Sequence, residues 1–117
     1  MFNFEKLVVW RKSIALADLV YRLTKSFPSD ERFGLTNQMR RSAISVSSNL
    51  AEGCSRASEA DFCRFTEIAT GSAFELSSQS VIARNQGLLN EDAHQQIYCA
   101  TLEIVRMLSG LRRFLQD

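Results

Sequence analysis

The sequence has little proline, little histidine and no paired cysteines. Its 117 residues include one proline, Pro28, and one histidine, His94. The three cysteines are odd in number and widely spaced, and no two form a CxxC pair, so the pattern argues against a disulfide framework and a zinc knuckle. We interpret Cys54, Cys63 and Cys99 as small apolar core residues of a protein in the reducing cytoplasm.

Long apolar runs and an excess of one charge are also missing. No uncharged apolar run approaches the ~18 residues that a membrane span needs, so we expect a soluble protein with no membrane partner. The segment LVVW at 7–10 is too short for a signal peptide, because Arg11 and Lys12 follow it immediately. The formal net charge of +1 gives no overall attraction to nucleic acid.

The near-neutral total hides a local polarity. Residues 1–56 hold nine Lys and Arg against five acids, whereas residues 57–99 hold two against six. One interpretation is that an acidic third helix lies against a basic second one. The other is that the basic half presents a face to phosphate groups.

Helical periodicity runs through the whole chain, and no segment alternates as a strand does. Apolar residues spaced three and four apart predict an all-α protein, a single domain over residues 1–117 folded as an antiparallel up-down-up-down four-helix bundle. We expect its helices at about 8–27, 36–55, 59–86 and 91–115. The expected core seams of the last three helices are Met39, Ala43, Val46, Leu50 and Cys54; Phe62, Phe65, Ala69, Ser72, Leu76 and Ala83; and Ala93, Ile97, Ala100, Ile104, Met107, Leu111 and Phe114.

Turn and cap signals separate these segments. Pro28 disfavours helical backbone angles for the residue before it, so the first helix should end at 27. Gly53 and the residues after it read as the next break, and Ser58 as the N-cap of the third helix. Gly87 reads as a C-terminal cap and Asn90 as the N-cap of the last helix.

Two features call for an additional packing neighbour. The first helix carries two apolar stripes, Leu7, Trp10, Ile14, Ala17 and Tyr21 beside Val9, Leu16, Val20, Leu23 and Phe27. A second neighbour would cover the second stripe. Gly71 lies in the middle of the third helix, where glycine costs ~1 kcal/mol relative to alanine, and we expect a close helix approach there as compensation.

Residues for catalysis or metal binding are scarce. Glu91 and His94 form one ExxH motif, but a di-iron bundle needs two such motifs and two further glutamates. We therefore expect no metal, no cofactor and no enzymatic activity, with His94 exposed at a helix start. No GxSxG elbow, phosphate loop or dinucleotide fingerprint occurs.

Several longer segments resemble a known family. They are FEKLVVW at 4–10, FPSDERFGLTNQMRRSAISVSSNLAEG at 27–53, Arg56, and FCRFTEIATGSAFEL at 62–76. Together they are similar to the four-helix bundle proteins of the 23S rRNA intervening-sequence type, over nearly the whole chain. The resemblance is specific in the middle third and generic in the last helix. The chain departs from it at Ser47, where members often carry a proline that would kink the second helix.

The resemblance implies a bundle that assembles as a cyclic homopentamer, encoded in some bacteria within insertions in large-subunit rRNA genes. It also extends to the accessory proteins of diversity-generating retroelements, pentameric bundles that bind a reverse transcriptase and nucleic acid. Those proteins are strongly basic, whereas this chain is not.

Two hypotheses follow for the polar residues. In the first, the chain is a non-enzymatic homo-oligomeric scaffold or adaptor, and a polar network at a helix or subunit contact fixes its register. The candidate network residues are Arg40, Arg41, Ser45, Asn49, Glu52, Arg56, Glu67 and Glu75. In the second, the chain binds RNA or a nucleic-acid-processing protein through basic faces. The candidate phosphate contacts are Arg11, Lys12, Arg40, Arg41, Arg56, Arg112 and Arg113.

Overall fold

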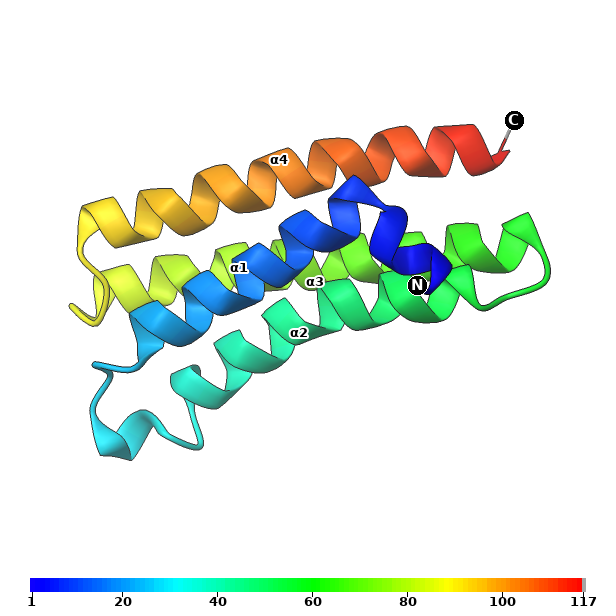
Figure 1. Ribbon diagram of the computed structural model, residues 1–117. Coiled ribbons are helices and arrows are strands. Elements are labelled where there is room, and N and C mark those ends of the chain that lie inside the picture. Colours follow the sequence, from blue (N-terminus) through cyan, green and yellow to red (C-terminus); the bar gives the residue numbers. More distant parts are fainter. Residues whose placement is uncertain (117) are drawn as a thin grey trace.

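The computed structural model describes residues 1–116, which form four α-helices and two short 3-10 helices (Figure 1). The helices are η1 (Asn3–Lys6), α1 (Val8–Thr24), η2 (Ser29–Glu31), α2 (Leu35–Cys54), α3 (Glu59–Asn85) and α4 (Glu91–Gln116). The colours in Figure 1 show that consecutive α-helices run in alternate directions and that both chain ends lie toward one end of the bundle. The all-α antiparallel bundle predicted from the periodicity is confirmed.

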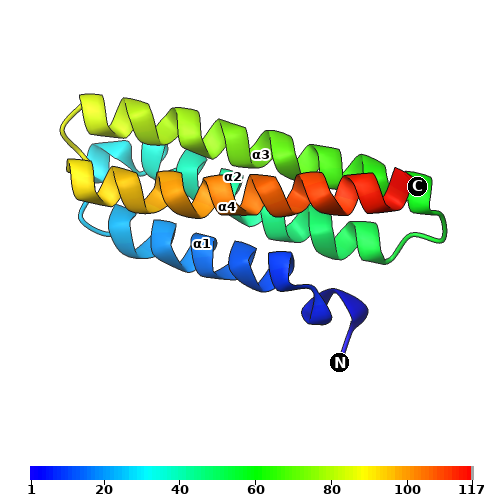
Figure 2. The ribbon, with the colours of Figure 1, turned by 90° about the horizontal axis from the view of Figure 1, so that it is seen from above.

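Each α-helix packs against two neighbours, in the closed order α1, α2, α3, α4 and back to α1. Within residues 1–116 the backbones of the diagonal pairs, α1 with α3 and α2 with α4, do not approach each other closely. Figure 2 shows α4 in front of α2, with α1 and α3 on opposite sides. The bundle measures 44 × 21 × 21 Å, and its length follows from the 27 residues of α3 at about 1.5 Å each. It therefore has four outer sides, each formed by two adjacent helices.

The core lies along the seams that the spacing predicts. Met39, Ala43, Val46 and Leu50 of α2 are fully buried, and the corresponding seam residues of α3 and α4 pack against them. Each fully buried leucine contributes roughly 1.5–3 kcal/mol to the hydrophobic stabilisation. The predicted seam of α4 is wrong at its end, where Phe114 is 73 % exposed. The last turn of α4 extends past the start of α1 and has no helix to cover that side.

The first helix ends at Thr24, three residues before the predicted end. The chain must be extended before Pro28, and it leaves the helix early enough for Phe27 N to donate to Thr24 O at 3.1 Å in a turn. The Thr24 hydroxyl donates to Val20 O at 2.8 Å within the last turn. The bounds of the other three helices differ from the expected ones by one residue at most at each end.

The connections on either side of α3 use the predicted caps. Ser58 Oγ accepts from Asp61 N at 3.1 Å, and Asn90 Oδ1 accepts from Ala93 N at 2.7 Å. Gly87 has a φ of +77°, the left-handed conformation that ends α3 at little cost for glycine. Ser58 fixes where α3 begins, and Gly87 and Asn90 fix where the chain turns from α3 into α4.

A close helix approach does occur, but at Gly53 and not at Gly71. Gly53 lies inside α2, where a Cβ atom would stand 2.8 Å from Phe62 Cδ1 and 3.0 Å from Phe65 Cβ of α3. At Gly71 a Cβ atom would meet nothing within 4 Å in the described chain, because this residue faces outward. The predicted break after the second helix is confirmed, because α2 ends at Cys54, one residue after Gly53. The expectation that Gly71 meets a neighbouring helix is wrong for the single chain.

Helix α1 is the least enclosed of the four. Its contact with α4 is smaller than the α2–α3 and α3–α4 contacts, and a groove of about 410 Å³ runs between α1 and α4. Lys12 Nζ and Glu103 Oε1 form an ion pair at 3.1 Å across this groove. Of its two apolar stripes, the one with Leu16 and Val20 is buried, whereas Ile14 on the other is exposed.

Candidate functional site

The polar residues of α2 meet α3 along the outer side that these two helices form. Ser42 Oγ donates to Glu75 Oε1 at 2.8 Å, and Ser45 Oγ and Ser72 Oγ lie 2.7 Å apart. The Asn49 amide donates to Ser45 Oγ at 3.0 Å and also to Ser45 O at 2.8 Å. The basic second helix thus lies against the acidic third one, but hydroxyl and amide groups make the contacts, with no ion pair between α2 and α3 in residues 1–116.

Arg40 points away from this seam, toward α1. Its Nε donates to Thr24 Oγ1 at 2.9 Å, and its guanidinium lies 4.4 Å from the centre of the Tyr21 ring. Such stacking over an aromatic ring contributes about 0.5–1 kcal/mol at a partly exposed position. Arg40 therefore joins α1 to α2 and contacts none of the acids of the candidate network.

Arg56, which follows the end of α2, pairs with Glu52 in the last turn of that helix. Arg56 Nη2 and Glu52 Oε1 are 2.8 Å apart, and the guanidinium lies 4.7 Å from the Phe65 ring centre. Both side chains are well exposed, so the ion pair contributes about 0.2–1 kcal/mol. Glu67 is exposed, and its one contact in the described residues is a weak one from Cys63 Sγ at 4.0 Å.

Arg41 and Glu75 line a surface depression of about 350 Å³ on the α2–α3 side, near the α1–α2 connection. Its lining residues are Phe33, Asn37, Gln38, Arg41, Glu75 and Gln79. Gln79 Oε1 is buried there and accepts no hydrogen bond from residues 1–116. Of the eight candidate network residues, the structure brings Ser45 and Asn49, Glu52 and Arg56, and Arg41 and Glu75 together as three separate pairs.

The seven candidate phosphate contacts do not form one stripe. Arg40 and Arg41 lie near the end of the bundle where α1 ends, and the other five lie toward the end that holds both chain termini. Arg11 donates to the carbonyls of Glu5 and Lys6 at 2.9 and 3.3 Å. With Lys12 paired to Glu103, this leaves Arg41, Arg112 and Arg113 without a polar partner inside the described chain.

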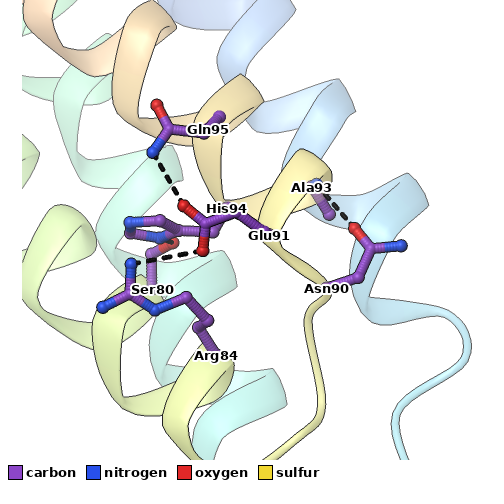
Figure 3. Close-up of polar contacts among 7 residues, drawn as sticks. All are labelled: Ser80, Arg84, Asn90, Glu91, Ala93, His94 and Gln95. Atoms are coloured by element: carbon purple, nitrogen blue, oxygen red, sulfur yellow. Dashed lines mark hydrogen bonds and ion pairs between the residues drawn. The ribbon is translucent and has the colours of Figure 1, made fainter.

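The single histidine is buried, which corrects the prediction of an exposed helix-start residue. His94 is 3 % exposed, and its Nδ1 lies 2.7 Å from Ser80 Oγ of α3, as Figure 3 shows. It stands on the inward-facing side of α4, in the same stripe as Ile97 and Thr101. The register of α4 makes this side face α3, and the serine meets the polar nitrogen that burial would otherwise leave unpaired.

Charged groups surround this pair at the surface. Glu91 Oε2 lies 3.5 Å from Arg84 Nη1, and Glu91 Oε1 accepts from Gln95 Nε2 at 3.0 Å (Figure 3). The hydrogen bond from Gln95, with smaller contributions from Arg84 and His94, holds the pKa of Glu91 below its ordinary value. The carboxylate also lies in the first turn of α4, where the helix dipole favours a negative charge.

The three cysteines occupy different environments. Cys63 is buried and Cys54 is half-buried, and burial raises the pKa of the Cys54 thiol. Cys99 is exposed, so its assignment to the core is wrong. It lies on the outer side of α4, next to Leu102 and Arg106. Among residues 1–116, no group of three or more His, Cys, Asp or Glu side chains is placed to hold a metal ion.

Large exposed apolar side chains lie on several sides of the bundle, Ile68 and Ile82 of α3 among them, and two groups of them stand on opposite sides. The sequence patterns singled out part of one group, in the outer stripe of α1, but not the other. On the α3–α4 side, Phe74 is 61 % exposed and forms a crevice of about 110 Å³ with Tyr98 and Leu102. We call this the α3–α4 face; its crevice is lined by Phe74, Ser77, Tyr98, Thr101, Leu102 and Val105. The outward-facing Gly71 lies one turn before Phe74 on the same helix. Phe74 lies off the predicted seam, so no sequence pattern indicated it, whereas Gly71 was noted only as a glycine in the middle of a helix.

The second apolar surface is the α1–α2 face, defined by Ile14, Tyr21 and Ile44. Tyr21 lies against Arg40 of α2, Ile14 is two turns before Tyr21, and Ile44 is one turn after Arg40. The helical repeat therefore places all three on the outer side that α1 and α2 share. In the closed order of helices, this side is opposite the α3–α4 face.

These observations define the chain as an antiparallel four-helix bundle with an α2–α3 polar seam. The sequence profile described as "23S rRNA-intervening sequence protein" matches residues 5–110. The chain belongs to this 23S rRNA-intervening sequence protein family.

A crystal structure from Bacteroides thetaiotaomicron VPI-5482 has a similar fold. It is a protein of unknown function from the S23 ribosomal protein family, and it superposes with a TM-score of 0.80. The two proteins are 23 % identical, and the alignment covers 90 % of this chain and 98 % of that chain. No curated protein matches this chain. In the described residues, every helix is too short or too polar to cross a membrane.

Proposed function

We propose that the chain is a non-enzymatic subunit of a homo-oligomeric ring, a pentamer, that acts as a cytoplasmic scaffold or adaptor. The observation that carries the proposal is the pair of apolar surfaces on opposite sides of one bundle. Covering large exposed apolar side chains such as Phe74 and Tyr98 with a partner removes their surface from water, which is favourable in free energy. Aromatic residues of this kind are enriched at the centres of protein interfaces.

The positions of the two surfaces favour a ring over a two-fold dimer. In an isologous dimer, one surface meets its own copy, so a single exposed face suffices. Two different faces on opposite sides instead support head-to-tail contacts, the α1–α2 face of one subunit against the α3–α4 face of the next. Such heterologous contacts close into a ring when the rotation per subunit divides a full turn.

Gly71 fits this arrangement. No neighbouring atom in the single chain requires a glycine at this position, where it lowers helix stability by about 1 kcal/mol relative to alanine. At a subunit contact, its missing side chain would let a neighbouring helix approach the backbone of α3 beside Phe74. The polar α2–α3 seam lies on a third side and holds the register of the two helices that carry the opposite faces.

Light scattering or native mass spectrometry of the purified chain at micromolar concentration tests the proposal. We expect the mass of a ring, with five subunits as the predicted number. The mass of one chain, unchanged on tenfold concentration, would refute the oligomer. A stable two-chain mass would refute the head-to-tail arrangement and leave an isologous dimer.

A further inference from the structure

The depression beside Arg41 takes no part in the proposed subunit contact, because it lies on the α2–α3 side. We propose that it binds one guanine nucleotide residue, either as a free nucleotide or within single-stranded RNA. Its six lining side chains come from the α1–α2 connection, α2 and α3. They combine an aromatic ring, a carboxylate, a guanidinium and three amides in one place.

The size and polarity of the depression select this class of ligand. Its volume of about 350 Å³ lies at the lower end of the range for small-ligand sites, about 300–1,000 Å³. Phe33 is the one apolar side chain in its lining. A lipid or an apolar helix would find no apolar groove here, whereas a flat polar heterocycle has both a face and an edge to present.

Phe33 supplies the platform for the face of the base. Its side chain is 81 % exposed, although a phenyl ring of this size ordinarily packs against the bundle. The guanidinium of Arg32 lies 4.9 Å from the ring centre and covers one side of the ring. The other side is available for stacking, which is how single-stranded bases are held on aromatic residues.

Glu75 supplies the edge recognition that favours guanine. Its Oε1 accepts from Ser42, which fixes the carboxylate, while Oε2 has no partner in residues 1–116. The Watson–Crick edge of guanine carries two adjacent donors, N1–H and the N2 amino group, and a carboxylate accepts both. Adenine offers one donor beside an acceptor on that edge, and uracil offers one donor between two carbonyls, so neither makes the same pair of bonds.

Gln79 adds an acceptor that lacks a donor. Its Oε1 is buried without a hydrogen bond, a state that folded proteins usually avoid. Because the last torsion of glutamine is broad, rotation of the amide can turn this oxygen to a bound donor in the depression. The amides of Asn37 and Gln38 can donate to the carbonyl oxygen of the base.

Arg41 is placed for the phosphate. Its side chain is exposed and has no hydrogen bond or ion pair within residues 1–116, in contrast to Arg40, which Thr24 and Tyr21 hold. One phosphate contact gives a weak salt dependence, with log K falling by only ~0.7 per tenfold rise in salt for a single strand. Recognition at this site therefore depends on the base more than on the backbone.

Fluorescence anisotropy of labelled five-nucleotide RNAs tests the proposal. We expect UUGUU to bind at least about tenfold more tightly than UUAUU or UUUUU, and Phe33→Ala to weaken UUGUU binding about tenfold through lost stacking. Glu75→Gln should remove the preference for guanine over adenine. Arg41→Ala should weaken the binding of all three RNAs to a similar extent. The matched control Arg106→Ala, at an exposed arginine away from the depression, should leave binding unchanged.

Guanosine monophosphate distinguishes the two sources of the nucleotide. If guanosine monophosphate competes as well as unlabelled UUGUU, the site takes the free nucleotide. If only the RNA binds, the site takes guanine within RNA. Both results support a guanine site. Three results would overturn the proposed guanine site: equal binding of all three RNAs, no binding at millimolar concentration, or equal losses of RNA affinity in Arg41→Ala and Arg106→Ala. Circular dichroism and the oligomer mass of each variant, measured alongside, separate a lost site from a lost fold or ring.

Discussion

At the scale of single residues, side chains that are adjacent in sequence have different environments. Arg40 and Arg41 are neighbours on α2, but a step of about 100° around the helix sends the first toward α1 and the second toward α3. Arg40 is held by a hydroxyl and an aromatic ring, while Arg41 lines an open depression. The pair therefore divides between a structural contact and a binding surface.

This difference predicts unequal costs for the two alanine variants. Arg40→Ala removes a charged hydrogen bond to Thr24 and the stacking on Tyr21, and should lower the free energy of unfolding by about 1–2 kcal/mol. Arg41→Ala, its matched control, should change this free energy by less than about 0.5 kcal/mol. Urea denaturation followed by circular dichroism measures both. Equal losses would mean that Arg41 is as firmly held as Arg40.

Glu91 gives a pH-dependent prediction. Its pKa in the folded protein is below the ordinary value of 4.5, so its charged form stabilises the fold, and this contribution is present above that value and is lost as the pH falls through the lower folded pKa. Glu91→Gln should therefore lower the urea midpoint at about pH 7, and the difference from the parent should shrink at about pH 3. A gap of the same size at both pH values would contradict the role of the charge.

At the scale of elements, the helices and their seams could be predicted because each helix buries a stripe that repeats along the sequence. The burial of one α2 stripe could be predicted without knowing which helices pack against it, as for Met39, Ala43, Val46 and Leu50. The caps of α3 and α4 could be predicted because their signals are local in sequence. What the periodicity could not give is which helix faces each side. The burial of His94 depends on Ser80 lying opposite it, and the depression at Arg41 depends on α3 supplying Glu75 and Gln79, so neither was visible from one segment alone.

Two of the three glycines inside α-helices, Gly53 and Gly71, illustrate the same limit and give a matched prediction. Gly71→Ala should raise the free energy of unfolding of the dilute, dissociated chain by about 0.5–1 kcal/mol, because the added methyl meets open space and helix propensity improves. Gly53→Ala should lower it by about 1–3 kcal/mol, because its Cβ would overlap Phe62 and Phe65. Urea titrations of both variants measure the signs. Two changes of the same sign would contradict the assigned environments.

At the scale of the whole molecule, the two opposite apolar faces make the assembly testable by complementation. Phe74→Glu places a charge in the α3–α4 face, and Ile44→Glu places one in the α1–α2 face, each at an exposed position that leaves the core intact. In a head-to-tail ring, each variant keeps one working face. Alone, each should have the mass of a single chain, and a one-to-one mixture should have the mass of two chains, because one intact pair of faces remains.

Size-exclusion chromatography with light scattering reads out this result. Ser55→Glu, at an exposed residue after α2 and outside both faces, serves as the control and should keep the ring. A mixture that stays at the mass of one chain would indicate that the two faces do not meet each other. Variants that assemble normally on their own would remove these faces from the contact altogether.

The open groove between α1 and α4 has a consequence for how the fold comes apart. The other three helices form two consecutive hairpins with the more extensive contacts, whereas α1 is joined to α4 across a groove bridged by Lys12 and Glu103. Helix α1 has the least extensive packing of the four, so its detachment should be the lowest-energy partial opening. In hydrogen–deuterium exchange of the dilute chain, the amides of α1 should acquire deuterium before those of α3, with α2 and α4 between them.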